Sequence, residues 1–248
     1  MNVLLTNDDG IHAVALRRLK EELASLGRVM IVAPDRDQSA TSHALTLHRP
    51  FRILQHEPDV CSVDGTPTDC VVTAFYGLFD AKPDLVISGI NLGPNMGEDV
   101  FYSGTVAAAI EGALQGVPSI SASLVTKEQA DFVEPARFVA RLVRRLLEHG
   151  LPRRHLLNVN LPGRPWPEVR GVKITRLGSR IYHDTLIKKV DPRGRDYYWI
   201  GGEDPEWEAI DGTDFEAVHD GWISVTPLRL DLTAEPALEK IAAWNLEK

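Results

Sequence analysis

The residues best suited to chemistry are two adjacent carboxylates near the start of the chain, Asp8 and Asp9, followed by Gly10. The uninterrupted apolar run at residues 2–6 predicts a buried strand of a parallel sheet, so the two carboxylates lie where that strand ends. Neighbouring carboxylates repel each other unless a cation or a shared proton neutralises them. Hard divalent ions prefer such oxygen ligands. The pattern therefore predicts a divalent metal site, with an ordinary Asx turn as the alternative.

The spacing of the two carboxylates also bears on mechanism. An aspartate nucleophile and its acid partner would need to lie two residues apart, because neighbouring side chains of a strand point to opposite faces. Gly10 tolerates unusual dihedrals and lets the chain turn, so that Asp8 and Asp9 converge on one point. The sequence thus favours two ligands of one ion over an aspartyl-phosphate mechanism.

Composition places broad limits on the protein. The 248 residues carry a net charge of -8, and 44% of them are hydrophobic, which suits one α/β domain and argues against nucleic acid as a partner. No basic leader and no apolar run long enough to cross a bilayer are visible, so we expect a cytoplasmic protein with no membrane partner. Cys61 and Cys70 lack a zinc-binding spacing and are expected to be reduced and structural.

Short apolar runs alternate with amphipathic segments, which predicts an α/β fold: a three-layer, Rossmann-like, mostly parallel sheet with a β-rich C-terminal extension. Residues 1–160 are expected to form the catalytic core, and residues 161–248 an extension with a protruding hairpin and a terminal helix. The segment 179–194 has few apolar anchors, and we expect it to be an arm used in oligomerisation. Strands are predicted at residues 2–6, 29–33, 51–54, 60–63, 84–88, 119–123, 156–159, 172–176, 197–200 and 222–226, and helices at residues 11–26, 71–78, 106–115, 135–150 and 236–244.

Polar residues follow two further predicted strands. Ser39 lies in the loop after the second strand, and Asn91 and Asn95 follow the strand at residues 84–88. The carboxyl ends of parallel strands share one sheet edge, where ligands bind in open α/β folds. We therefore expect these side chains to approach the two carboxylates, although an Asn between glycines also suits a simple left-handed turn.

A fourth element supplies an anion site. Ser103, Gly104 and Thr105 precede an Ala-rich helix, and a helix N-terminus offers free N–H groups and a positive dipole end. These residues are predicted to contact phosphate, and the alternative is simple helix capping. Asn95 is a further candidate for phosphate contact, and His43 is a candidate proton donor to the leaving group.

Hard oxygen donors beside an anion site indicate metal-assisted attack of water on a phosphate ester. Asp8 or Asp9 would accept the proton of the water, and no phosphoenzyme would form. Mg²⁺ or Mn²⁺ is favoured over Zn²⁺, because only His12 and His43 lie near these strand ends.

Five linked motifs resemble the SurE family in their order along the chain. They are TNDDG at residues 6–10, APDR at 33–36 with Ser39, GTPTDC at 65–70, SGINLGPN at 88–95 and YSGTVAAA at 102–109. The resemblance implies a phosphatase of nucleoside 5′- and 3′-monophosphates, with short polyphosphate as a further substrate of some members.

The same resemblance implies one divalent cation per subunit, Mg²⁺ or Mn²⁺, bound by Asp8, Asp9, Ser39 and Asn91. It also implies a homodimer or homotetramer that exchanges its C-terminal hairpin. Two other readings stay open: a metal-dependent nucleotide-sugar transferase and a non-catalytic nucleotide-binding protein. A classical dinucleotide-binding protein is excluded, because no Gly-x-Gly-x-x-Gly follows the first strand.

Overall fold

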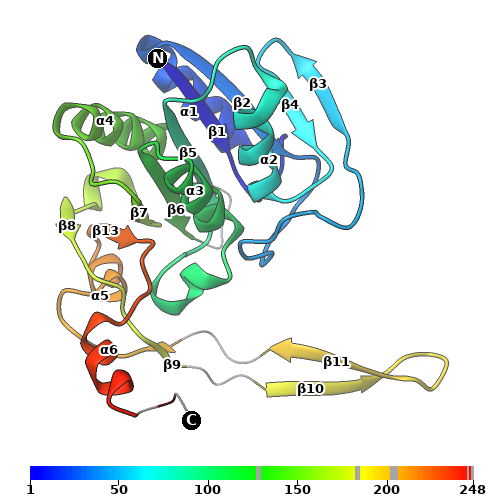
Figure 1. Cartoon of the computed structure of the whole chain (residues 1–248), viewed down its shortest axis with the longest axis vertical. Coiled ribbons are helices and arrows are strands. Elements are labelled where there is room, and N and C mark those ends of the chain that lie inside the picture. Colours follow the sequence, from blue (N-terminus) through cyan, green and yellow to red (C-terminus); the bar gives the residue numbers. More distant parts are fainter. Residues whose placement is uncertain (127–129, 182–184, 202–205, 245, 247–248) are drawn as a thin grey trace.

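A nine-stranded sheet organises the computed structural model, which describes residues 1–126, 130–181, 185–201, 206–244 and 246 (Figure 1). In spatial order its strands are β3 (Ile53–Glu57), β4 (Val60–Val63), β2 (Arg28–Pro34), β1 (Asn2–Thr6), β5 (Leu85–Leu92), β6 (Ser119–Val125), β7 (His155–Pro162), β13 (Ile223–Arg229) and β8 (Val172–Ile174).

The centre of the sheet is parallel. Strand β1 pairs in parallel with β2 and β5, and β6 pairs in parallel with β5 and β7. Antiparallel pairs occur toward the edges, where β3 meets β4 and β13 meets β7. The prediction of a mostly parallel α/β sheet is confirmed. Strand β13 belongs to this same sheet although it comes from the C-terminal part of the chain. The division of the chain into a core (residues 1–160) and an extension (residues 161–248) stays a prediction.

Helices cover both faces of the sheet. α1 (Val14–Leu23) and α4 (Val133–His149) contact each other on one face, and α2 (Pro67–Thr73) and α3 (Gly104–Leu114) do so on the other. Neighbouring residues of β1 show why its apolar run is continuous. Leu5 packs into the core under α1 and α4, whereas Leu4 packs into the core under α2, and both side chains are fully buried.

Some boundaries differ from the sequence-based expectation. α2 begins at Pro67, four residues earlier than predicted, because Thr66 caps it: the Thr66 hydroxyl accepts the Asp69 N–H, and the Asp69 carboxylate accepts the Thr66 N–H. The short helix α5 (Asp214–His219) was not predicted. The remaining helical turns are Ala24–Leu26, Ala74–Leu78, Gly97–Phe101 and Trp166–Glu168.

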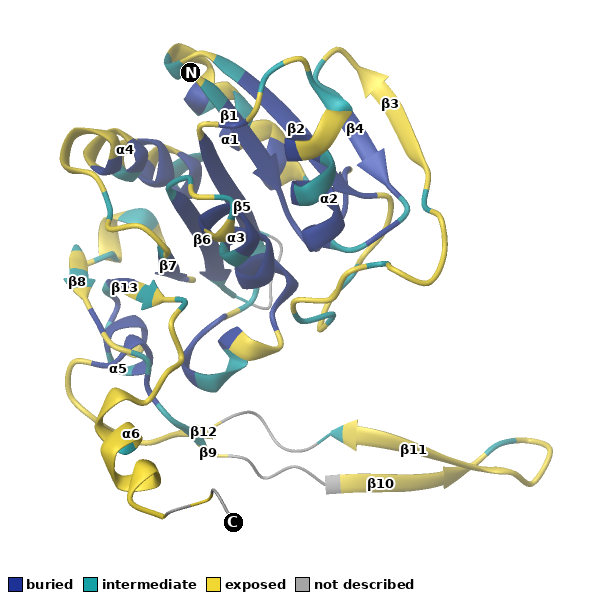
Figure 2. Cartoon of the chain, viewed as in Figure 1, coloured by how far each residue is buried: buried dark blue, intermediate teal, exposed yellow. Residues whose placement is uncertain are grey.

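The C-terminal part carries an exposed arm. β10 (Thr185–Val190) and β11 (Asp196–Gly201) form an antiparallel hairpin that projects away from the sheet (Figure 1). Almost all of the arm is exposed, as is the terminal helix α6 (Glu235–Ala242) (Figure 2). Residues 182–184 of the predicted arm segment lie outside the described residues. A second short pair joins β9 (Arg180–Ile181) to β12 (Glu206–Trp207).

No helix in the described part of the chain is both long and apolar enough to cross a membrane.

Candidate active site

The turn after β1 is built by its own side chains. The Asn7 amide closes it from both sides, since Nδ2 donates to the Gly10 carbonyl at 3.0 Å and Oδ1 accepts the Gly10 N–H at 3.1 Å. Gly10 adopts φ +98° and lies against the backbone of Arg36, where an added Cβ would come within 3.2 Å of the Arg36 carbonyl carbon. The chain can therefore turn directly after the two carboxylates.

Asp8 is buried, and Thr105 fixes its carboxylate. The Thr105 N–H donates to Oδ2 at 3.1 Å, and the Thr105 hydroxyl donates to Oδ1 in a short hydrogen bond. Burial raises the pKa of Asp8, and these hydrogen bonds oppose the rise. The end of β1 is thereby joined to the N-terminus of α3. Asp8 lies at the end of β1, as the sequence predicts, and it is only 5% exposed.

Asp9 is partly buried and is joined to a different loop. The backbone N–H of Leu92, at the end of β5, lowers the pKa of the Asp9 carboxyl. Burial and the nearby charges of Asp8 and Asp37 together raise the pKa of Asp9 to about 6. Repulsion between partly buried carboxylates is what a bound cation would relieve, so this pair fits a divalent metal.

The loop after β2 brings Ser39 to the same edge. The Gln38 N–H donates to the Asp8 carbonyl at 2.8 Å, which attaches this loop to the turn after β1. Ser39 itself is held by Asp37, whose Oδ1 accepts the Ser39 N–H at 2.7 Å and its hydroxyl at 2.6 Å. Asp37 was not among the predicted site residues, although its spacing to Ser39 is that of an Asx turn.

Asn91 precedes Leu92 at the end of β5. Its Nδ2 donates to the Gly93 carbonyl at 3.0 Å, so its amide oxygen is the atom able to bind a cation. The structure thus links three of the predicted loops: Asp8 and Asp9 follow β1, Ser39 follows β2, and Asn91 lies at the end of β5.

These side chains offer carboxylate, hydroxyl and amide oxygens. No group of three or more His, Cys, Asp or Glu side chains suited to a metal occurs among the described residues. A mixed oxygen set of this kind suits Mg²⁺ or Mn²⁺ better than Zn²⁺, which prefers nitrogen and sulfur ligands.

The N-terminus of α3 lies against Asp8. The Ser103 hydroxyl accepts the Val106 N–H at 3.0 Å and so caps the helix. Both Thr105 donors, which were predicted to contact phosphate, are directed instead to Asp8. Thr105 therefore positions a carboxylate in this structure, and phosphate contact by Ser103 and Gly104 stays a prediction.

Position 104 requires a glycine, because the Asp8 side chain approaches its backbone too closely to leave room for a Cβ atom. An added Cβ would come within 2.9 Å of the Asp8 Cβ and 3.2 Å of the Pro67 Cγ. We expect Gly104→Ala to displace the Asp8 carboxylate and to lower kcat for phosphate release by about 10- to 100-fold, since small displacements of catalytic groups have such effects. Gly201→Ala is the control, because its nearest contact would be an ordinary 3.9 Å. Equal activity of the two variants would refute close packing at Gly104 as a requirement.

Asn95 is buried and joins its loop to the sheet. Its Nδ2 donates to the Ser123 hydroxyl at 2.8 Å, and its N–H donates to Asn160 Oδ1 at 2.9 Å. Its carbonyl accepts Nδ2 of Asn158 at 2.8 Å and of Asn160 at 3.0 Å. These bonds fix the loop that follows Asn91, and phosphate binding by Asn95 stays a prediction.

His43 contacts the second half of α3. Its Nε2 lies 3.0 Å from Glu111 Oε2, and this contact lowers the pKa of Glu111. The neighbouring Ser42 N–H donates to the Tyr102 carbonyl at 3.1 Å. These contacts hold the Ser39 loop against α3 and the turn that precedes it. The role of His43 as a proton donor stays a prediction.

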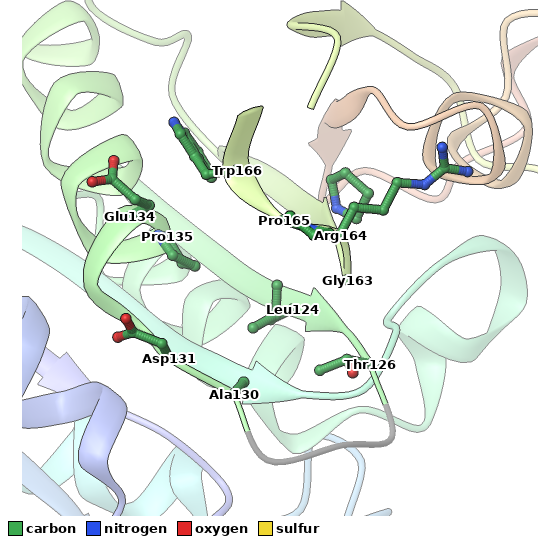
Figure 3. A pocket seen from close by; sticks show the side chains of 11 residues that line it. Leu124, Thr126, Ala130, Asp131, Glu134, Pro135, Gly163, Arg164, Pro165 and Trp166 are labelled. Atoms are coloured by element: carbon green, nitrogen blue, oxygen red, sulfur yellow. The ribbon is translucent and has the colours of Figure 1, made fainter. Parts of the chain in front are cut away.

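A separate cavity of about 280 Å³ lies at the start of α4 (Figure 3). Asp131 and Glu134 line it, and Arg164 extends away from these two carboxylates. None of the predicted metal ligands lines this cavity. Two carboxylates without a facing cation would repel phosphate, so this cavity does not suit a phosphate ester.

Comparisons with known proteins identify the family of this chain. The model of the family "Survival protein SurE" matches residues 3–184. The "5'-nucleotidase SurE" of Geobacter sulfurreducens is 50% identical over 99% of this chain and 94% of its own length. That of Gemmatimonas aurantiaca is 51% identical over 98% of both chains. The crystal structure of the SurE protein from Aquifex aeolicus superposes with a TM-score of 0.88 at 44% identity, covering 98% of this chain and 99% of that one. The chain therefore belongs to the SurE family.

Proposed function

We propose that this protein is a divalent-metal-dependent phosphatase that hydrolyses nucleoside 5′- and 3′-monophosphates to nucleoside and phosphate, with short polyphosphate as a further substrate. One observation carries the proposal most strongly: Asp8 and Asp9 stand side by side directly after β1, and hydrogen bonds from Thr105 hold the Asp8 carboxylate at the N-terminus of α3. Relatives named 5'-nucleotidase SurE, about half identical over nearly the whole chain, support it.

One Mg²⁺ or Mn²⁺ per subunit would be held by Asp8, Asp9, Ser39 and Asn91. When bound, such a cation polarises phosphoryl oxygens and makes a nearby water more acidic. Its positive charge would also let a dianionic phosphate approach two carboxylates in a protein of net charge -8.

The protein side chains divide the remaining work. Thr105 engages both oxygens of the Asp8 carboxylate, so Asp8 is held in place, and Asp9 is the better acceptor for the proton of the attacking water. The N–H of Gly104 and the Ser103 hydroxyl would bind phosphoryl oxygens. A bond forms from the water oxygen to phosphorus, the bond from phosphorus to the ribose oxygen breaks, and that oxygen takes a proton from solvent or from His43.

Release of inorganic phosphate from AMP and GMP in the presence of Mn²⁺ tests this function. The expected result is stoichiometric phosphate and nucleoside. Binding of AMP without phosphate release would indicate a nucleotide-binding protein instead, and transfer of a sugar from a nucleotide sugar without phosphate release would indicate a transferase. The relatives favour neither alternative.

We also propose that the β10–β11 arm binds a second copy of the chain in a homodimer or homotetramer. Its Trp199 is 62% exposed and its Ile200 is 85% exposed, which is unfavourable for a free monomer. Replacing both by Asp should convert the assembly to monomers in light scattering. Leu54→Asp on the edge strand β3, which is also exposed, is the control. A monomeric wild-type protein would contradict the proposal.

A further inference from the structure

We propose that a second cavity, which lies beside the candidate metal site, binds the base of the nucleotide. We call this cavity the aromatic pocket. This inference rests on the proposed function and names a further site for its substrate. The cavity has a volume of about 760 Å³, within the usual range for small-molecule sites. Its walls include Leu92, Gly93, Pro94, Arg164, Trp207 and Phe215.

The aromatic pocket shares a wall with the candidate metal site. Leu92 lines the pocket, and its backbone N–H lowers the pKa of the Asp9 carboxyl. The preceding residue is the candidate ligand Asn91, and the following residues, Gly93 and Pro94, continue the wall. A nucleoside monophosphate carries its charge at one end and a flat apolar base at the other. The candidate metal site suits the charged phosphate end, and the aromatic pocket suits the apolar base.

The chemistry of the walls suits a purine or pyrimidine ring. Trp207 stacks on Phe215 with a centroid distance of 5.6 Å and an interplanar angle of 4°, and it is 36% exposed. Phe215 is buried beneath it and fixes its orientation. A base stacks favourably on an exposed aromatic ring, and this interaction tolerates any base.

Arg164 adds a polar group to this apolar cavity. Its guanidinium donates a hydrogen bond to the His219 carbonyl, and both residues line the pocket. A guanidinium held in this way has further N–H donors, which can reach the ring nitrogens or carbonyl oxygens of a base.

A neighbouring cavity of about 370 Å³ is the main competitor. It is lined by Ser103 and His43, but most of its walls are aliphatic, including Leu156, Leu228 and Leu230. Its exposed aromatic residue is Phe101. This cavity lacks a stacked aromatic pair among its lining residues, so we assign the base to the aromatic pocket.

Steady-state kinetics with AMP and with ribose 5-phosphate, at one fixed Mn²⁺ concentration, test the assignment. The two substrates share the sugar and the phosphate, and only AMP carries a base. Trp207→Ala should raise KM for AMP by about 10-fold, as expected for the loss of one stacking surface, and leave kcat/KM for ribose 5-phosphate unchanged. Trp207→Phe should restore most of the wild-type KM, and Phe101→Ala should not change it.

Two outcomes would overturn the inference: an equal loss for both substrates in Trp207→Ala, or a rise in KM for AMP in Phe101→Ala alone. Binding of adenosine, measured by calorimetry, tests the pocket separately from catalysis. We expect about 10-fold weaker binding in Trp207→Ala than in the wild type. If neither AMP nor ribose 5-phosphate is hydrolysed, the proposed function fails, and the adenosine result still decides the pocket: equal binding by both proteins contradicts it.

Discussion

Asp8→Asn and Asp9→Asn should each lower kcat for AMP hydrolysis by on the order of 1,000-fold, the upper range seen when one preorganised charged or polar group is lost from an active site. Each substitution removes one negative charge from the pair that would hold the cation. Asp9→Asn also removes the proposed proton acceptor. Phosphate release over a range of Mn²⁺ concentrations measures the loss, and excess Mn²⁺ should restore little activity.

The two variants should remain folded, and this can be checked independently of activity. In Asp8→Asn the amide oxygen can still accept the Thr105 hydroxyl, although its NH₂ group cannot accept the Thr105 N–H. Asp9 is more exposed than Asp8, so Asp9→Asn should disturb the structure less. Asp131→Asn, an exposed carboxylate outside the site, is the matched control and should retain full activity. Wild-type turnover in either Asp8→Asn or Asp9→Asn would show that the carboxylate pair is not catalytic.

Removal of divalent ions should abolish phosphate release. After treatment with EDTA and dialysis, turnover of AMP should fall to background, because Asp8 and Asp9 would repel the phosphate dianion without a cation between them. Addition of Mn²⁺ or Mg²⁺ should restore the rate. Circular dichroism before and after treatment should show the same fold, since the cores on both faces of the sheet are apolar and independent of the metal site.

Full activity after verified removal of the metal would contradict a metal-dependent mechanism. Loss of activity that neither Mn²⁺ nor Mg²⁺ reverses would point to a different cation or to damage by the treatment. A parallel incubation with EDTA already saturated by Mg²⁺ distinguishes chelation from any other effect of the reagent.

Local patterns in the sequence were sufficient to predict much of the fold. The run at residues 2–6 predicts a strand buried on both faces, and the structure places Leu4 and Leu5 in opposite cores. The turn after it follows from Asn7 and Gly10, whose hydrogen bonds span only three residues. Such short-range signals explain why the start of the site could be located without a structure.

Contacts between distant residues could not be predicted in this way. Thr105 contacts Asp8 across 97 positions, and Asn95 contacts Asn160 across 65. A Ser-Gly-Thr sequence before a helix looks the same whether its donors bind phosphate or a carboxylate of the protein. The contact of Thr105 with Asp8 could therefore be identified only from the three-dimensional structure. The aromatic pocket also depends on distant pairing, because Trp207 meets Phe215 only once β12 and α5 are in place.

Titration of the metal-free protein with Mn²⁺, followed by electron paramagnetic resonance, tests most directly whether the loops after three strands together hold one cation. We expect one Mn²⁺ per chain in the wild type, no measurable binding at that site in Asp9→Asn, and weaker binding in Asn91→Ala. A wild-type protein that binds no Mn²⁺, or an Asp9→Asn variant that binds it with wild-type affinity, would contradict the proposed metal site.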